Sequence, residues 1–292
     1  GSPGPVSSAP RRGGRRAGAP GEPASGARPI PSMATSEGGT SLDDLDLLVD
    51  LHRDARRQGP GGDDQTRRAI ALSGLRGRGA LAIADIGCGT GASTLVLAQE
   101  LDAHVVGVDL VPAFLRRLNA AAARRHLDER VATVEAGMDA LPFDEGSFDG
   151  IWSEGALYPM GFARGIAAWR RFLKPGGVLA VSELTWLTRE RPDELERHWI
   201  GEYPEVATAS TKMALLEEGG YSPIGFFVLP ERCWLENYYR PMEDRFAAFL
   251  ARHGHSEAAR RIVDAERHEI ALYERYSRFV GYGYYVARRT EE

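Results

Sequence analysis

The sequence predicts an α/β fold, with a doubly wound sheet of seven strands and a helical cap inserted at one edge. Three observations support this. From residue 81 onward, short apolar runs alternate with amphipathic stretches, which is typical of a mostly parallel sheet with helices on both faces. A glycine-rich turn follows the first apolar run, as in folds that bind a ligand at the carboxyl edge of the sheet. A largely helical, aromatic-rich stretch at 231–278 interrupts the alternation.

Residues 1–40 are predicted to be a disordered extension, because Gly, Pro, Ala, Ser and Arg leave little to bury. The Gly-Ser start is typical of a cloning remnant, and Met33 is a candidate natural start. Residues 1–32 carry a net charge of +4 while the chain carries −5, so the remainder carries −9. An acidic body argues against a nucleic-acid partner.

Residues 41–292 are expected to form a single domain that begins with helices in the range 41–75, where "RRQGPGGDD" at 56–64 separates two helical stretches. The predicted strands are 81–86, 104–109, 131–135, 148–153 and 178–183, and the helices between them are 90–100, 112–126 and 161–173. The segment "KPGG" at 174–177 is predicted to be a tight turn that leads into the fifth strand.

Beyond residue 183 the alternation is less regular. A helix within 213–229 is expected to end at Gly219 and Gly220 and to lead into a sixth strand, and 282–288 reads as the seventh. The remaining stretches, 184–210 and 231–278, are predicted to be insertions that contact the substrate.

The stretch "ADIGCGTGAS" at 84–93 allows two ligand hypotheses. Its glycines satisfy the dinucleotide fingerprint G-x-G-x-x-G/A, and Asp109 stands where a ribose-binding acid is expected, so a nicotinamide cofactor fits the pattern. Asp85 favours a different ligand, because a carboxylate beside the loop would oppose a pyrophosphate and attract a cation. S-adenosylmethionine (SAM) carries a sulfonium and an ammonium group and no phosphate. The alternative is a structural role, in which Asp85 accepts backbone N–H bonds and caps the loop.

Four successive segments resemble the motifs of class I SAM-dependent methyltransferases, which have a Rossmann-like fold. They are "ADIGCGTGASTLVLAQ", "VVGVDLVPAFL", "DALPFDEGSFDGIWSEGALY" and "RRFLKPGGVLAVSE". The match covers roughly residues 80–183, the expected SAM-binding core, and is most similar to the ubiquinone/menaquinone-type, small-molecule branch.

The resemblance implies roles for individual residues. The loop Gly87-Cys88-Gly89-Thr90-Gly91 would let its backbone approach the methionyl part of SAM, with Asp85 near the ammonium group. Asp109 would accept both ribose hydroxyls, Leu110 would pack on the adenine, and Met138 would donate its N–H to an adenine nitrogen. Many relatives have Asp just before that Met position. Here Gly137 stands there, so Asp139 or water must serve the adenine amino group.

The carboxyl ends of the fourth and fifth strands are expected to border the reacting methyl group. Ser153 is a predicted cofactor contact there, and Tyr158 and Trp186 are predicted to contact the substrate. Glu154 is the candidate catalytic residue, and three hypotheses stay open for it. It is a general base, an anionic partner for a cation, or a structural carboxylate that accepts backbone N–H bonds.

The distribution of aromatic residues suggests which part of the chain contacts the substrate. Residues 221–286 hold fourteen of the chain's twenty-five Phe, Trp and Tyr residues, and Trp234, Tyr238 and Tyr239 are predicted to line an apolar pocket. Gln58 either closes over the cofactor or lies in a turn whose glycines end a helix. The histidines show no ligand cluster, so no metal is expected.

The predicted function is SAM-dependent methyl transfer to an N, O or C atom of a small molecule, with S-adenosylhomocysteine (SAH) as the product. The alternatives are C-methylation of a prenyl diphosphate alkene, a non-catalytic SAM-binding protein, and an NAD-dependent oxidoreductase. No apolar run is long enough to span a membrane, and two cysteines, one of them in the glycine loop, favour a reducing cytoplasm. A homodimer is a further expectation.

Overall fold

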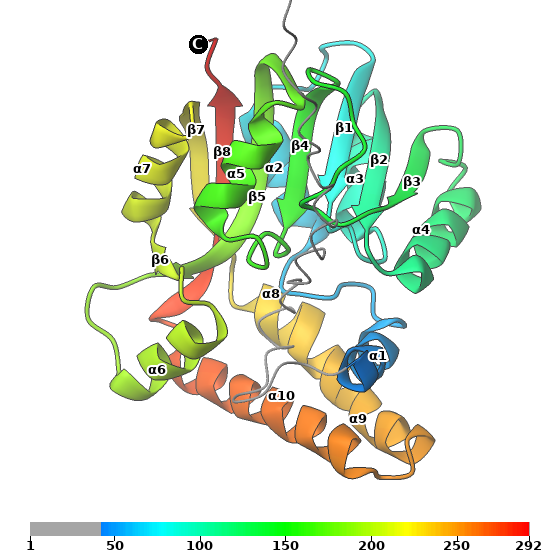
Figure 1. The fold of residues 1–292 in the computed structure, drawn as a ribbon, viewed down its shortest axis with the longest axis vertical. Helices are drawn as coiled ribbons and strands as arrows, with labels where there is room; N and C mark the ends of the chain where they lie inside the picture. The colour runs from blue at the N-terminus through cyan, green and yellow to red at the C-terminus, as the bar shows by residue number, and fades with distance from the viewer. Residues whose placement is uncertain (1–41, 292) are drawn as a thin grey trace, which may run out of the picture.

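The protein is built on one twisted sheet with helices on both faces and a group of helices beyond one edge (Figure 1). A computed structural model describes residues 42–291, so the predicted extension at 1–40 lies outside the described residues. The strand order is β3-β2-β1-β4-β5-β8-β7, with the short β6 paired to β5. β8 is antiparallel to β5 and β7, whereas the pairs among β1 to β5 are parallel. The predicted α/β doubly wound class is confirmed.

The strands lie close to their predicted positions. Their bounds are β1 Leu81–Ile86, β2 Ala103–Asp109, β3 Val131–Glu135, β4 Phe148–Glu154, β5 Leu173–Trp186, β6 Ala207–Thr208, β7 Tyr221–Val228 and β8 Val280–Arg289. The sheet has eight strands, not seven, because Ala207 and Thr208 pair with the end of β5. This strand of two residues is too short for any periodic pattern to indicate.

The "KPGG" prediction was wrong in detail, because this segment lies inside β5. Phe148 pairs with Leu173 and Gly150 pairs with Val178, so the intervening residues of β5 form an irregular bulge against β4. Gly176 adopts a φ of +71° there, which explains why glycine stands at this position.

Two layers of helices cover the sheet. α2 (Asp63–Ser73) and α3 (Ala92–Glu100) contribute to the hydrophobic cluster on one face, whereas α5 (Phe162–Arg170) and α7 (Ala209–Glu218) pack on the other. α4 (Pro112–Arg124) contacts β2 and β3, and begins at a proline in its first turn, as predicted. α3 starts later than predicted because Gly91 is its N-cap, and α5 ends at Arg170, before the predicted position.

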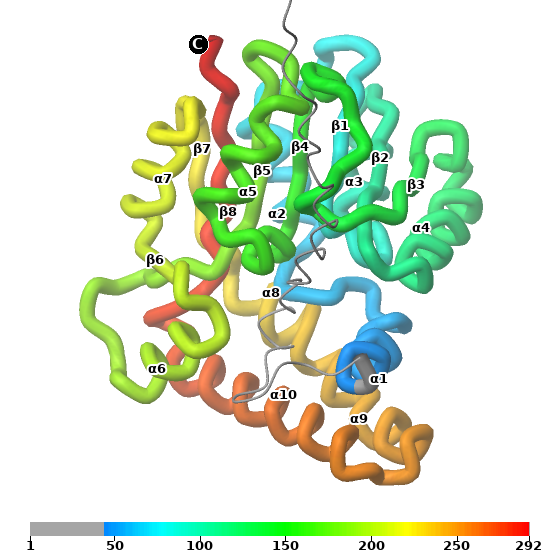
Figure 2. The backbone as a smooth tube through the Cα atoms, viewed as in Figure 1, coloured from blue at the N-terminus to red at the C-terminus, as the bar shows by residue number. Residues whose placement is uncertain are grey.

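The remaining helices lie beyond the carboxyl edge of the parallel strands, as Figures 1 and 2 show. They are α1 (Leu42–His52), α6 (Asp193–Glu202), α8 (Arg232–Trp234), the π-helical turn η2 (Leu235–Tyr239), α9 (Arg240–Arg252) and α10 (Glu257–Tyr276). α1, far away in sequence, packs against α9 and α10. The insertion predicted at 231–278 is therefore helical, as expected, and it packs together with the N-terminal helix α1.

No helix between residues 42 and 291 combines the length and the apolar character that a membrane crossing requires.

Candidate functional site

The glycine loop joins β1 to α3 at the carboxyl edge of the sheet. Gly87, Gly89 and Gly91 adopt φ values of +72°, +53° and +86°, a region that side chains with a Cβ rarely occupy. At Gly87 a Cβ would lie 2.3 Å from the Cβ of Ala156, in the turn after β4. The loop backbone thus touches the neighbouring strand end directly. Cys88, between the first two glycines, is buried and forms no disulfide.

Asp85, at the end of β1, is completely buried, and only one of its two carboxylate oxygens has hydrogen-bond partners among the described residues. Its Oδ2 accepts hydrogen bonds from Ser93 Oγ at 2.7 Å and Thr94 Oγ1 at 2.6 Å, both on α3. Its Oδ1 has no hydrogen-bond partner among the described residues. Burial raises the pKa of Asp85 to about 6 against the opposing effect of these hydroxyls. Since both donors to Asp85 among the described residues are hydroxyls, the capping alternative, in which backbone N–H groups hold Asp85, does not describe this structure.

Asp109 ends β2 and braces the glycine loop. Its Oδ2 accepts from Gly89 N at 2.8 Å and its Oδ1 from Val111 N at 2.9 Å. Burial raises the pKa of Asp109. Each carboxylate oxygen has a second lone pair, so both remain able to accept a ribose hydroxyl. Leu110 follows with 55% of its surface exposed, which leaves it available to pack on a planar ring.

The segment after β3 holds the predicted adenine contacts. Met138 packs against the cluster of α5 and α7, and its carbonyl accepts from Trp169 Nε1 at 2.9 Å. A Cβ at Gly137 would lie 2.7 Å from Asp139 Oδ1, so Asp139 already occupies the space where relatives of the predicted family carry a side chain. This is consistent with Asp139 serving in place of the missing acid.

A strap at residues 53–62, between α1 and α2, crosses the glycine loop. Gln58 Oε1 accepts from Thr90 N at 2.9 Å, and Gln58 Nε2 donates to Thr90 Oγ1 at 3.2 Å. The strap also reaches the cap, because Asn237 Nδ2 on η2 donates to Gly61 O at 2.7 Å. Gln58 thus contacts the glycine loop, and its closure over the cofactor stays a prediction.

Glu154, the last residue of β4, lies in a buried polar network. Its Oε2 accepts from Arg57 NH1 at 2.8 Å, and its Oε1 accepts from Thr66 Oγ1 at 2.6 Å and Tyr284 OH at 3.0 Å. The side chains of Arg57 and Glu154 are 9% and 6% exposed. All three donors are side chains and none is a backbone N–H group, and the role of Glu154 stays a prediction. The neighbouring Ser153 Oγ is buried and has no partner among the described residues.

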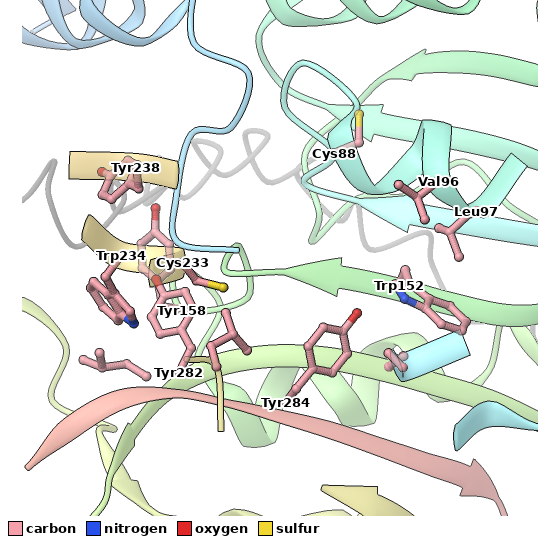
Figure 3. Close-up of a cluster of buried hydrophobic side chains, with 14 of the residues drawn as sticks. Cys88, Val96, Leu97, Trp152, Tyr158, Cys233, Trp234, Tyr238, Tyr282 and Tyr284 are labelled. Carbon is pink, nitrogen blue, oxygen red and sulfur yellow. The ribbon is translucent and has the colours of Figure 1, made fainter. Parts of the chain in front are cut away.

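The predicted substrate residues meet in one hydrophobic cluster. Figure 3 draws Tyr158, Trp234 and Tyr238 among these buried side chains. The rings of Trp234 and Tyr239 are 5.7 Å apart, and those of Tyr238 and Tyr239 are 5.1 Å apart. Trp186, at the end of β5, belongs to the same cluster and carries Arg191 over its ring at 4.3 Å. Their role as substrate contacts stays a prediction.

Two polar residues near this edge, Arg57 and Lys212, were not among the predicted site residues, whereas Glu183 was expected to border the space in front of the reacting methyl group. Arg57 pairs with Glu154, and Glu183 and Lys212 are fully buried on β5 and α7. Glu183 can be recognised from the sequence, because a charged residue stands there inside an otherwise apolar strand. No local pattern distinguishes Arg57 or Lys212 from exposed residues.

A surface hollow of about 410 Å³ lies at the opposite, amino edge of the parallel strands. None of the predicted site residues lines it. Its lining residues are Glu145, Gly146, Ala167, Arg170, Arg171, Pro175 and Arg289. Among residues 42–291, no three His, Cys, Asp or Glu side chains group as a metal site.

Comparisons with known proteins agree with this geometry. Residues 83–177 match the family model described as a methyltransferase domain. A sterol 24-C-methyltransferase of Kluyveromyces lactis is 26% identical over 170 residues, which is 55% of this chain and 45% of that protein. The match thus spans less than half of this relative.

Solved structures share the fold over most of the chain. A SAM-dependent methyltransferase from Geobacter sulfurreducens, in complex with SAH, superposes with a TM-score of 0.73 at 17% identity, covering 83% of this chain and 97% of that one. The [4+2]-cyclase SpnF superposes with a TM-score of 0.69 at 21% identity, covering 91% and 98%. The family model, the glycine loop and the sheet order all lead to one assignment: the chain contains a class I SAM-dependent methyltransferase domain.

Proposed function

We propose that the protein binds SAM at the glycine loop and transfers its methyl group to a small organic molecule. The observation that carries this proposal is the unpartnered Oδ1 of the buried Asp85 beside the loop. A buried carboxylate oxygen without a donor is costly, and a cationic ammonium group would supply one. A pyrophosphate at the same place would add negative charge, so the nicotinamide alternative fits the loop poorly.

In this proposal the chain's own residues divide the work of binding. Asp85 holds the ammonium group, Asp109 accepts the ribose hydroxyls, and Leu110 covers the adenine. Gln58 and the strap at 53–62 close over the loop and keep water out. SAM supplies the methyl group on a positively charged sulfur, and in-line alignment with the acceptor provides much of the rate.

The acceptor is proposed to be a metabolite in the cytoplasm, since the body of the chain is acidic. The alternative acceptor, a prenyl diphosphate, would need free basic residues near the cap. Arg191 pairs with Glu196 and covers Trp186, Arg232 lies 3.7 Å from Asp64, and Arg245 donates to Leu51 O. These three arginines are engaged within the protein, whereas the two further candidates, Arg189 and Arg240, are exposed, so the prenyl diphosphate stays the alternative acceptor.

The test separates cofactor binding from catalysis. SAM and SAH should each raise the melting temperature, because a ligand selective for the folded state stabilises it, and NAD should not. Asp109→Ala should weaken SAH binding in calorimetry, while the exposed Glu135→Gln serves as a control. Methyl-labelled SAM incubated with metabolite pools should then yield a labelled product. Equal stabilisation by NAD and SAM would refute the cofactor assignment, and SAM binding without any labelled product would refute methyl transfer.

A further inference from the structure

A second buried polar cluster lies on the other side of β5 from the glycine loop's hydrophobic cluster. It joins Glu183 on β5, Lys212 on α7 and Tyr203, which follows α6. Glu183 and Lys212 are completely buried, and Tyr203 is 3% exposed. The cluster plays no part in the cofactor binding proposed above.

Both charged groups of the cluster have hydrogen-bonding capacity that the described residues leave unused. Glu183 Oε1 accepts from the backbone N–H of Leu184 at 2.8 Å, but Glu183 Oε2 has no hydrogen-bond partner among the described residues. Lys212 Nζ can donate three hydrogen bonds. Among the described residues it donates one, to Tyr203 OH at the long distance of 3.4 Å. Its other neighbours are the rings of Phe162 and Tyr203, with centroids 4.5 Å and 5.1 Å away, and the carboxylates of Glu183 and Glu205, whose charges oppose the effect of burial on its pKa.

Lysine is a rare choice in this chain. Lys212 is one of two lysines, and arginine supplies the other 34 basic residues counted as Lys or Arg. An arginine stays charged in a protein, whereas a buried lysine loses its proton readily. Burial lowers the pKa of Lys212 and raises the pKa of Glu183, while the charge of each group opposes this effect on the other.

The cluster borders the reacting edge through Tyr158. The ring of Tyr158 packs edge-on against Tyr203 with centroids 6.4 Å apart. Tyr158 lies in the turn after β4, and its pKa is raised by burial and, to a smaller extent, by charges that include those of Glu183 and Asp109. Glu205 closes the far side by accepting from Phe162 N at 2.9 Å.

We propose that Glu183 and Lys212 together hold the hydroxyl group of an alcohol or phenol, which makes the protein an O-methyltransferase. A hydroxyl accepts from the ammonium and donates to the unpartnered carboxylate oxygen at the same time. An alkylamine, protonated at neutral pH, has no lone pair with which to accept a hydrogen bond from Lys212. An alkene offers neither group a hydrogen bond.

This inference rests on the proposed function, because the methyl group must come from SAM. The hydroxyl oxygen forms the new bond to the methyl carbon while the carbon–sulfur bond breaks toward sulfur. The hydroxyl proton passes to Glu183 Oε2, and Lys212 stabilises the charge that develops on the oxygen. The products are the methyl ether, SAH and a protonated Glu183.

The two lysines make the test direct. Protein with ¹³C-labelled lysine side chains should show two lysine signals in NMR spectra, and Lys174→Arg assigns the one from Lys212. In the presence of SAH, 4-nitrophenol should shift the Lys212 signal, and 4-nitroanisole, whose oxygen is already methylated, should not. The bound 4-nitrophenol should also show a higher phenolate absorbance than the free compound at the same pH.

Binding constants provide the second measurement. 4-Nitrophenol should bind at least about tenfold more tightly than 4-nitroanisole, as expected for a hydrogen bond to a charged group. Glu183→Gln and Lys212→Met should each remove most of this preference, and Lys174→Met should keep it, because Lys174 is 45% exposed and pairs with Asp149. Equal binding of the two probes, or an unmoved Lys212 signal at saturation, would overturn the inference while SAH binding still upheld the cofactor site. Failure of SAH to bind would overturn both.

Discussion

At the scale of single residues, Asp85 ties cofactor binding to pH. Its pKa, raised by burial to about 6, exceeds the ordinary value of 3.8, so the folded protein retains this proton longer than the unfolded chain. Between pH 4 and 6 the contribution of Asp85 to the free energy of unfolding therefore falls as pH rises. A bound cationic ligand lowers the pKa of Asp85, because it stabilises the ionised carboxylate.

SAM affinity should consequently fall below pH 6, by up to about tenfold per unit. Asp85→Asn should weaken SAM binding at pH 7.5 by roughly tenfold or more and remove this dependence on pH. Calorimetric titrations at pH 5, 6 and 7.5 would check both effects. An unchanged slope in the variant would show that another group controls binding.

Glu154 offers a second test at this scale. Replacing it with glutamine removes the buried charge partner of Arg57 and leaves it only the ion pair with Asp63 at 3.3 Å, so we expect a loss of about 1–3 kcal/mol in the free energy of unfolding. Urea denaturation would measure it, with Glu135→Gln, exposed at the end of β3, as the matched control. Full stability together with lost turnover would instead favour the general-base hypothesis.

At the scale of elements, α10 depends on its first turn. Ser256 is its N-cap, and Ser256 Oγ accepts from Ala259 N at 3.3 Å. Ser256→Ala should cost about 1 kcal/mol of unfolding free energy, whereas Ser256→Asp should keep most of it. Chemical denaturation would compare both with Ser222→Ala on the exposed side of β7. A loss in the Asp variant equal to that in the Ala variant would contradict the capping role.

At the scale of the whole molecule, cap and sheet share one hydrophobic cluster. It runs from Trp152 and Tyr284 on the sheet to Trp234 and Phe249 in the cap without a break. We therefore predict that residues 42–291 unfold in one transition. Single-tryptophan variants that retain either Trp152 or Trp234 should report the same urea midpoint, and two separate midpoints would show that the cap is an independent unit.

Much of the fold could be predicted because its signals are local. The alternation of apolar periods located β1 and β3 to the residue, and the glycines with positive φ marked the turn after β1. The same local reasoning misplaced "KPGG", since a Pro-Gly-Gly turn and a bulge inside a strand have the same composition. Only the pairing with β4 distinguishes them.

The sequence by itself determined the α/β class, the cofactor loop and its flanking acids, because short-range periodicity and backbone freedom specify these. Only the tertiary structure decided which charged side chains meet in buried contacts. Arg57 and Glu154 lie 97 positions apart and meet in a buried pair, and Glu183 and Lys212 are brought to one side of the sheet from different elements. Such contacts depend on how strands and helices pack in three dimensions, and no local pattern of residues records that packing.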